Sequence, residues 1–190
     1  MKIMQLLPEL NSGGVERGTL EIARALIAAG HESIVVSNGG RLVAQLEAEG
    51  SQHLSLAIHK KSLSSLWQIR PLRKLIQQHQ PVRSRVPAWL THFALKGIPV
   101  QQRPHLISTV HGFYSTNRYS AIMTQAEKVI AVSDSVVKYI TEHYQNCPPE
   151  HIIRIYRGIS PQEFPHGYQP SALWINQTFK AESAPELASE

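Results

Sequence analysis

The chain has 190 residues, of which 42% are hydrophobic and 17% charged, and its formal net charge is +5. This size and composition are typical of a globular protein with a real core and exclude an intrinsically disordered chain. The single cysteine, Cys147, excludes an internal disulfide framework and fits a reducing compartment, and no stretch approaches the roughly 18 apolar residues of a membrane-spanning helix.

In chain order, strand-like and helix-like segments alternate up to about residue 156. Residues 2–7 predict a buried strand, which Pro8 and Glu9 interrupt too early for a secretory signal, and residues 15–29 predict a helix that ends at Gly30. The later predicted strands are 32–37, 53–57, 105–110, 128–132 and 152–156. The later predicted helices are 41–49, 65–78, 88–96, 119–125 and 136–143. This alternation predicts an α/β fold of the Rossmann-like kind, with a parallel sheet and helices on both faces.

The pattern changes near the C-terminal end. After Gly158 the chain becomes rich in proline, and only residues 171–180 suggest a short helix before an acidic tail. We therefore expect a Rossmann-like domain over residues 1–165 and a connector or tail over residues 166–190.

The turn after the first strand carries Gly13 and Gly14 and is the first candidate site. Adjacent glycines let the backbone approach a ligand closely, and the N–H groups at a helix start suit an anion, typically phosphate. An ordinary strand-to-helix turn favours glycine as well, so both interpretations stand at this point. The glycine spacing does not match a nicotinamide-cofactor fingerprint, and the chain has neither a P-loop triplet nor a G-x-S-x-G elbow.

Two further candidate sites follow later strands. His111 comes directly after a buried strand, where a neutral imidazole can donate a hydrogen bond to a substrate hydroxyl or a developing charge. A strand-end histidine satisfied by the backbone is the alternative. Ser133 and Asp134 follow the next strand and are expected to cap the helix after it. Because ligands of parallel α/β folds bind outside the carboxyl ends of the strands, we expect all three sites on one sheet edge.

The middle of the chain is strongly basic. Residues 51–126 contain no Asp or Glu but ten Lys and Arg residues. Such asymmetry favours an anionic partner, and Arg83, Arg85 and Arg118 are candidates for acceptor or anion binding, although a solvated basic face is the plainer interpretation. The ten histidines show no helical pair with a carboxylate, so no metal site is expected.

Four segments, taken together, resemble one known family. Residues 10–17, 108–115, 129–136 and 157–164 are similar in order and spacing to the N-terminal domain of a retaining, GT-B-fold bacterial glycosyltransferase of the group-one family (family four). The nearest likeness is to enzymes that build lipopolysaccharide core or other surface glycans.

The resemblance implies a nucleotide-sugar donor held between two Rossmann-like domains, with no metal or other cofactor. Gly13 and Gly14 would lie against the donor diphosphate, and His111 would touch the donor sugar near the anomeric centre. Ser133 and Asp134 would shape the same edge. The basic stretch would face a glycolipid or glycan acceptor, or the anionic inner-membrane surface of a cytoplasmic, peripherally attached enzyme, and a nucleic-acid partner is not expected.

The chain departs from the family pattern in two places. It stops about where the second domain would begin, and Pro81 is followed at once by Val82, where the family has an acidic-apolar-apolar-His strand. We therefore expect one core strand to be missing or shortened. The leading hypothesis is an acceptor-side glycosyltransferase half that is incomplete as an isolated chain. The alternative is a non-catalytic module that binds an anionic glycolipid, a membrane or nucleic acid.

Overall fold

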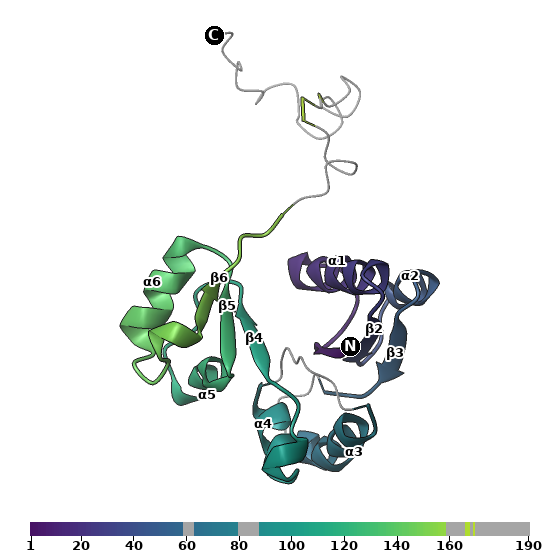
Figure 1. Ribbon diagram of the computed structural model, residues 1–190, viewed down its shortest axis with the longest axis horizontal. Helices are drawn as coiled ribbons and strands as arrows, with labels where there is room; N and C mark the ends of the chain where they lie inside the picture. The colour runs from purple at the N-terminus through teal and green to yellow at the C-terminus, as the bar shows by residue number, and fades with distance from the viewer. Residues whose placement is uncertain (59–62, 80–87, 159–165, 168, 170–190) are drawn as a thin grey trace. The chain divides into compact units, whose positions relative to one another are not determined.

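Figure 1 shows the computed structural model, which describes residues 1–58, 63–79, 88–158, 166, 167 and 169. The chain divides into two compact units, Met1–Tyr156 and Arg157–Glu190. All helices and strands found in the described residues belong to the first unit. The predicted helix over residues 171–180 lies outside the described residues, and the predicted boundary at residue 165 stays a prediction.

Strands and helices alternate along the first unit. The strands are β1 (Lys2–Leu6), β2 (Glu32–Ser37), β3 (Gln52–Ser55), β4 (Ile107–Val110), β5 (Lys128–Ala131) and β6 (Ile152–Arg154). The α-helices are α1 (Gly14–Ala28), α2 (Val43–Ala48), α3 (Ile69–His79), α4 (Ala88–Lys96), α5 (Arg118–Ala121) and α6 (Asp134–His143). Short 3-10 helices are η1 (Leu63–Gln68), η2 (Val100–Gln102), η3 (Ile122–Gln125) and η4 (Pro149–His151). The predicted α/β class is confirmed.

The described strands form two parallel sheets of three strands each. One has the order β1-β2-β3 and the other β4-β5-β6. In the first, Lys2 pairs with Glu32 and Leu6 with Val36, and in the second Val110 pairs with Ala131. The single sheet expected from the sequence is therefore not what the described residues form. The strand expected after Pro81 would fall within residues 80–87, outside the described part of the chain.

The first sheet has a core on each face, as Figure 1 shows by the helices on its two sides. Successive side chains of a strand point to opposite faces, so the even-numbered residues Met4 and Leu6 pack with α3 and α4, whereas Leu7 packs with α1 and α2. The first core contains Met4, Leu6, Ile34, Val36, Ile58, Leu72, Ile76, Leu90, Ala94 and Ile98. Strands that are buried on both faces explain the continuous apolar runs seen in the sequence.

The second sheet has its own core, formed mainly with α6. Val110, Val129 and Ala131 from the strands pack with Val136 and Ile140 of that helix. A further tie joins β4 to η3, because the Ser108 hydroxyl donates to the Met123 carbonyl at 2.5 Å. The carboxyl ends of β4 and β5 are thus fixed relative to the start of α6.

Helix ends agree with the expected signals except in the third helix. Gly30 adopts a φ of 74° just after α1, and the His31 amide donates to the Leu26 carbonyl at 2.9 Å, as expected of a glycine that ends a helix. The predicted third helix is divided into η1 and α3. Pro71 lies in the first turn of α3, where a missing backbone N–H costs nothing.

Among the described residues, no helix is both long and apolar enough to span a bilayer.

Candidate functional site

The Gly13–Gly14 turn connects β1 to the start of α1. Gly13 is the residue before the helix, in extended backbone with φ 165°, and Gly14 is its first residue. Gly13, the N-cap residue, has no side chain that could cap the helix. The turn follows the carboxyl end of β1, and the start of a helix has the positive polarity that favours an anion.

The loop before this turn is held by the turn between β2 and α2. The Leu10 amide donates to the Gly39 carbonyl at 2.8 Å, and the Leu42 amide donates to the Leu10 carbonyl at 2.9 Å. Gly40 has a φ of 144°, and a Cβ there would lie 2.4 Å from the Leu10 carbonyl carbon. Only glycine fits this close approach, so Gly40 fixes the path of the chain into Gly13.

Two charged residues near this turn were not singled out from the sequence. The Glu16 carboxylate lies against Gly13, because a Cβ built on Gly13 would be 2.5 Å from Glu16 Oε2. The Arg41 Nε donates to the Asn11 carbonyl at 2.9 Å, which brings a guanidinium to the same loop. An incoming phosphate would therefore meet one acid and one base. The sequence showed both residues, but not that the loops bring them together.

His111 follows β4 directly, as predicted. Its side chain is half-buried, and both ring nitrogens have almost no exposed surface. The next residue, Gly112, has no atom within 4 Å of the position that a Cβ would occupy. The space beside the Gly112 backbone is therefore open, whereas the ring nitrogens of His111 are covered.

Ser133 and Asp134 follow β5, the strand that pairs with β4. The Val136 amide donates to the Ser133 hydroxyl at 3.2 Å, so Ser133 is the predicted N-cap of α6. This bond uses the hydroxyl oxygen as an acceptor and leaves its proton for another partner. Because Val110 and Ala131 are register partners, His111 and Ser133 lie at the same edge of the second sheet.

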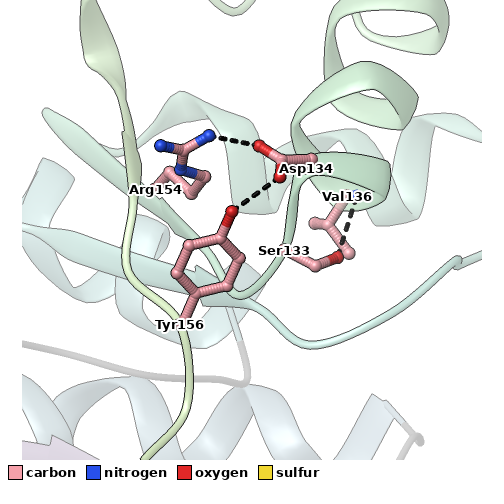
Figure 2. A network of polar contacts seen from close by, with 5 residues as sticks. All are labelled: Ser133, Asp134, Val136, Arg154 and Tyr156. Carbon is pink, nitrogen blue, oxygen red and sulfur yellow. Dashed lines mark hydrogen bonds and ion pairs between the residues drawn. The ribbon is translucent and has the colours of Figure 1, made fainter.

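The Asp134 carboxylate is held by two residues from the chain after β5 (Figure 2). The Tyr156 hydroxyl donates to Asp134 Oδ2 at 2.6 Å, and the Arg154 guanidinium forms an ion pair with Oδ1. The hydrogen bond from Tyr156, and next the one from Arg154, lower the pKa of Asp134 below its ordinary value. Asp134 is therefore an ionised carboxylate with its oxygens already engaged, which makes it a poor proton acceptor.

Arg154 and Tyr156 were missed by the sequence reasoning. Alternation along an extended chain puts residues two apart on one side, which is a weak signal for such a pair. The Arg154 guanidinium also lies 5.1 Å from the centroid of the Tyr156 ring. Since guanidinium has five N–H donors, Arg154 can pair with Asp134 and still donate to a phosphate.

Three arginines were also predicted to bind an anion or the acceptor. Arg83 and Arg85 lie outside the described residues. Arg118 is the first residue of α5, a helix capped by the Asn117 side chain, which accepts from the Ser120 amide at 2.9 Å. The role of these three arginines stays a prediction.

The structure thus brings some predicted residues together. His111, Ser133 and Asp134 share one edge of the second sheet, whereas Gly13 and Gly14 follow β1 of the first sheet. That these two groups form one cleft stays a prediction. Within the described ranges, no three His, Cys, Asp or Glu side chains are placed to hold a metal ion.

A hollow of about 550 Å³ lies away from these residues. It is lined by His105, Ile107, Glu127, Lys128 and His151. These residues precede or begin β4 and β5 or lie in η4, so the hollow is at the amino ends of the strands. It therefore lies at the edge opposite to His111 and Ser133.

Most of the chain matches the model of one protein family. The family described as Glycosyltransferase Family 4 matches residues 12–163, a range that includes Gly13, His111 and Asp134. No curated protein sequence matches the chain.

Several solved structures have the same fold. A glycosyltransferase from Rickettsia africae ESF-5 is 28% identical, with a TM-score of 0.72, and the match covers 93% of this chain and 48% of that one. Anabaena HepE, in complex with UDP and glucose, is 19% identical with a TM-score of 0.66, over 94% of this chain and 49% of that one. The apo lipopolysaccharide outer core galactosyltransferase WaaB is 14% identical with a TM-score of 0.65, over 84% and 46%. This chain spans about half the length of these structures.

Proposed function

Because the chain belongs to glycosyltransferase family 4, we propose that it forms the acceptor-side half of a GT-B enzyme. This enzyme transfers a sugar from a nucleotide-sugar donor to a glycan acceptor. The observation that carries the proposal is the family match over residues 12–163, which spans the glycine turn and the carboxyl ends of β4 and β5. We assign a role in this reaction to each of these features in turn.

The donor is a nucleoside diphosphate sugar. Support comes from the start of α1 behind Gly13, since the start of a helix favours a diphosphate, and from the similar structure HepE, which holds UDP-glucose or UDP and glucose. The acceptor is a surface glycan of the lipopolysaccharide type. Its support is the fold shared with WaaB, together with the absence of Asp and Glu from residues 51–126, which suits a phosphorylated acceptor.

His111 acts on the donor sugar. Its half-buried ring follows the carboxyl end of β4, and the low polarity of a buried site strengthens a hydrogen bond from the ring to a hydroxyl or to the charge that develops on bond cleavage. The ring binds and orients, and Ser133 contributes the hydroxyl proton that its capping bond leaves available.

One experiment tests the proposal directly. A chimera is made in which this chain replaces the N-terminal half of the Rickettsia africae glycosyltransferase, and UDP release is measured with a panel of UDP-sugars. We expect turnover that His111→Ala removes. We expect His105→Ala to keep it, because His105 is exposed and lies at the opposite edge of the sheet. Equal turnover by both variants would refute the assigned role of His111.

A binding measurement covers the case of a chimera that does not fold. In the 190-residue chain, we expect UDP-glucose to shift the amide signals of residues 13–17, weakly, and to leave those of η4 unchanged. Shifts confined to other regions would contradict the donor site. The chain by itself should show little or no transfer to a lipopolysaccharide acceptor, because it covers only 48% of the Rickettsia africae glycosyltransferase. Robust turnover by this chain would refute the expectation that it is inactive on its own.

The second candidate function is a non-catalytic module that binds an anionic membrane. The observation that favours it is the exposed side of η1 and α3, where helical spacing aligns Trp67, which is 78% exposed, with Arg70 and Lys74. An aromatic ring beside cations is typical of a surface that meets lipid headgroups. The chain should float with anionic vesicles at low salt and lose them at high salt, and retention of duplex DNA in a gel shift would favour nucleic acid instead.

A further inference from the structure

Two tyrosines hold the segment that follows His111: Tyr139 of α6 and Tyr144, the residue that caps the C-terminal end of this helix. The Tyr139 hydroxyl donates to the Tyr114 carbonyl, and the Tyr144 hydroxyl donates to the Ser115 carbonyl at 3.3 Å. Both bonds span at least 25 residues, so they are long-range contacts that local sequence does not require. Both acceptors are backbone atoms within four residues of His111.

Ring packing supports the same contact. The Phe113 ring meets the Tyr139 ring edge to face, with centroids 5.0 Å apart, and the Tyr144 ring meets Tyr139 in the same way at 5.8 Å. Phe113 is nevertheless 68% exposed. Its ring is therefore held from one side only, by α6, and without that helix it would have little reason to stay in place.

The Tyr144 hydroxyl is suited to act as a constant hydrogen-bond donor. Tyr144 is only 6% exposed, and burial, followed by its interactions with Tyr139, raises its pKa to about 12. It therefore keeps its proton throughout the physiological range, as a hydroxyl that donates to a carbonyl must. The bond to Ser115 is not a titrating switch.

The far end of the segment is also fixed. The Asn117 side-chain amide donates to the Ser115 hydroxyl at 2.9 Å, while its oxygen caps α5. The segment from residue 112 to residue 116 is thus held at its start by β4, in its middle by α6 and at its end by α5. The attachment in the middle differs from the other two, because α6 also carries Asp134 and begins beside Ser133.

We infer that Tyr139 and Tyr144 are positioning residues, which hold the segment after β4 so that the His111 ring keeps its orientation toward the donor. They touch neither sugar nor phosphate and act through the backbone of residues 113–115. This inference rests on the proposed function for its purpose, but the positioning itself is a property of the isolated chain. One helix then sets the geometry at both β4 and β5, because its first turn shapes the edge and its last turns hold the His111 segment.

The test uses hydrogen exchange and NMR on the 190-residue chain. Tyr139→Phe and Tyr144→Phe remove only the hydroxyls and keep the rings. We expect amide exchange at residues 113–117 to rise about tenfold in the double variant, and the His111 ring signals to shift, while exchange in β5 stays as in the wild type. Thr141→Val is the matched control, because its hydroxyl bonds only the Val137 carbonyl of the same helix.

Each outcome decides the inference. Unchanged exchange at residues 113–117, or a His111 signal that does not move, overturns it. A uniform rise that includes β5 also overturns it, because the tyrosines would then serve core stability alone. If the double variant folds poorly, Tyr139→Phe by itself gives the same reading at a more exposed position. Neither readout needs transfer activity, so a lack of turnover in the chimera would refute the proposed function and leave this result standing.

Discussion

Replacing Gly40 by alanine should be far more harmful than replacing its neighbour Gly39. Both glycines have positive φ, 144° at Gly40 and 91° at Gly39. At Gly39 an added Cβ has no atom within 4 Å, whereas at Gly40 it would lie 2.4 Å from the Leu10 carbonyl carbon and 2.8 Å from the Asn11 nitrogen. The two variants therefore share the conformational cost and differ in the steric one.

The magnitude follows from these contacts. A backbone conformation that L-residues rarely adopt costs about 1–3 kcal/mol, and this applies to both variants. At Gly40 the loop must also move by roughly 1 Å to reach an ordinary carbon–carbon separation, since such contacts lie near 3.5–4.0 Å. This movement breaks the bonds that join Leu10 to Gly39 and Leu42, at about 1 kcal/mol each. We expect Gly40→Ala to cost about 2 kcal/mol more than Gly39→Ala.

Urea unfolding of both variants measures this difference as a shift in midpoint at constant slope. Amide exchange at Leu10 and Leu42 localises it, because both amides should exchange faster in Gly40→Ala alone. Equal midpoints for the two variants would refute the reasoning. They would mean that the loop before Gly13 yields at no cost and that the turn after β2 does not define its path.

Three further predictions concern charges and caps. Glu16→Gln should lower the free energy of unfolding by about 0.5 kcal/mol, because a carboxylate stabilises the start of a helix. The same change removes a negative charge beside Gly13, so inorganic pyrophosphate should bind more tightly in calorimetry. Weaker binding would contradict the site. Ser133→Ala should cost about 1 kcal/mol in urea unfolding, and Ser135→Ala almost nothing; equal costs would refute the cap. Because the pKa of Asp134 is lowered in the folded chain, its contribution is complete above its ordinary value of 3.8 and is lost as the pH falls through the lowered pKa. Asp134→Asn should therefore flatten the acid limb of the stability–pH curve, and a curve parallel to the wild type would disprove the network with Tyr156.

Local features were predictable from the sequence because local residues determine them. The run of residues 32–37 is a strand with the predicted bounds, and the predicted helix 88–96 is α4. Ser133 caps α6 by accepting a hydrogen bond from the amide of Val136, three residues further along the chain. The order of strands and helices followed from the same periodicity. The family match was accessible too, since short segments in a fixed order carried it.

Features that depend on contacts between distant segments were not predictable. Nothing in the pattern near Gly40 shows that Leu10 will pack on it, and nothing near Asp134 shows that Tyr156 will reach its carboxylate. The division into two sheets is of the same kind, because strand pairing is a long-range property. Periodicity predicts which residues are buried, but not which residues of distant segments they pack against.

The charges at the two predicted donor contacts explain why the chain alone should bind its donor weakly. Glu16 lies against Gly13, and Asp134 lies at the carboxyl end of β5, so a diphosphate would approach a carboxylate in both places. Arg154 is already paired with Asp134, and Arg41 already donates to the Asn11 carbonyl. Binding then requires either displacement of these local partners or additional cations from outside. We therefore expect tight donor binding only when such cations are supplied from outside this chain, as they would be in the two-domain enzyme of the proposed function.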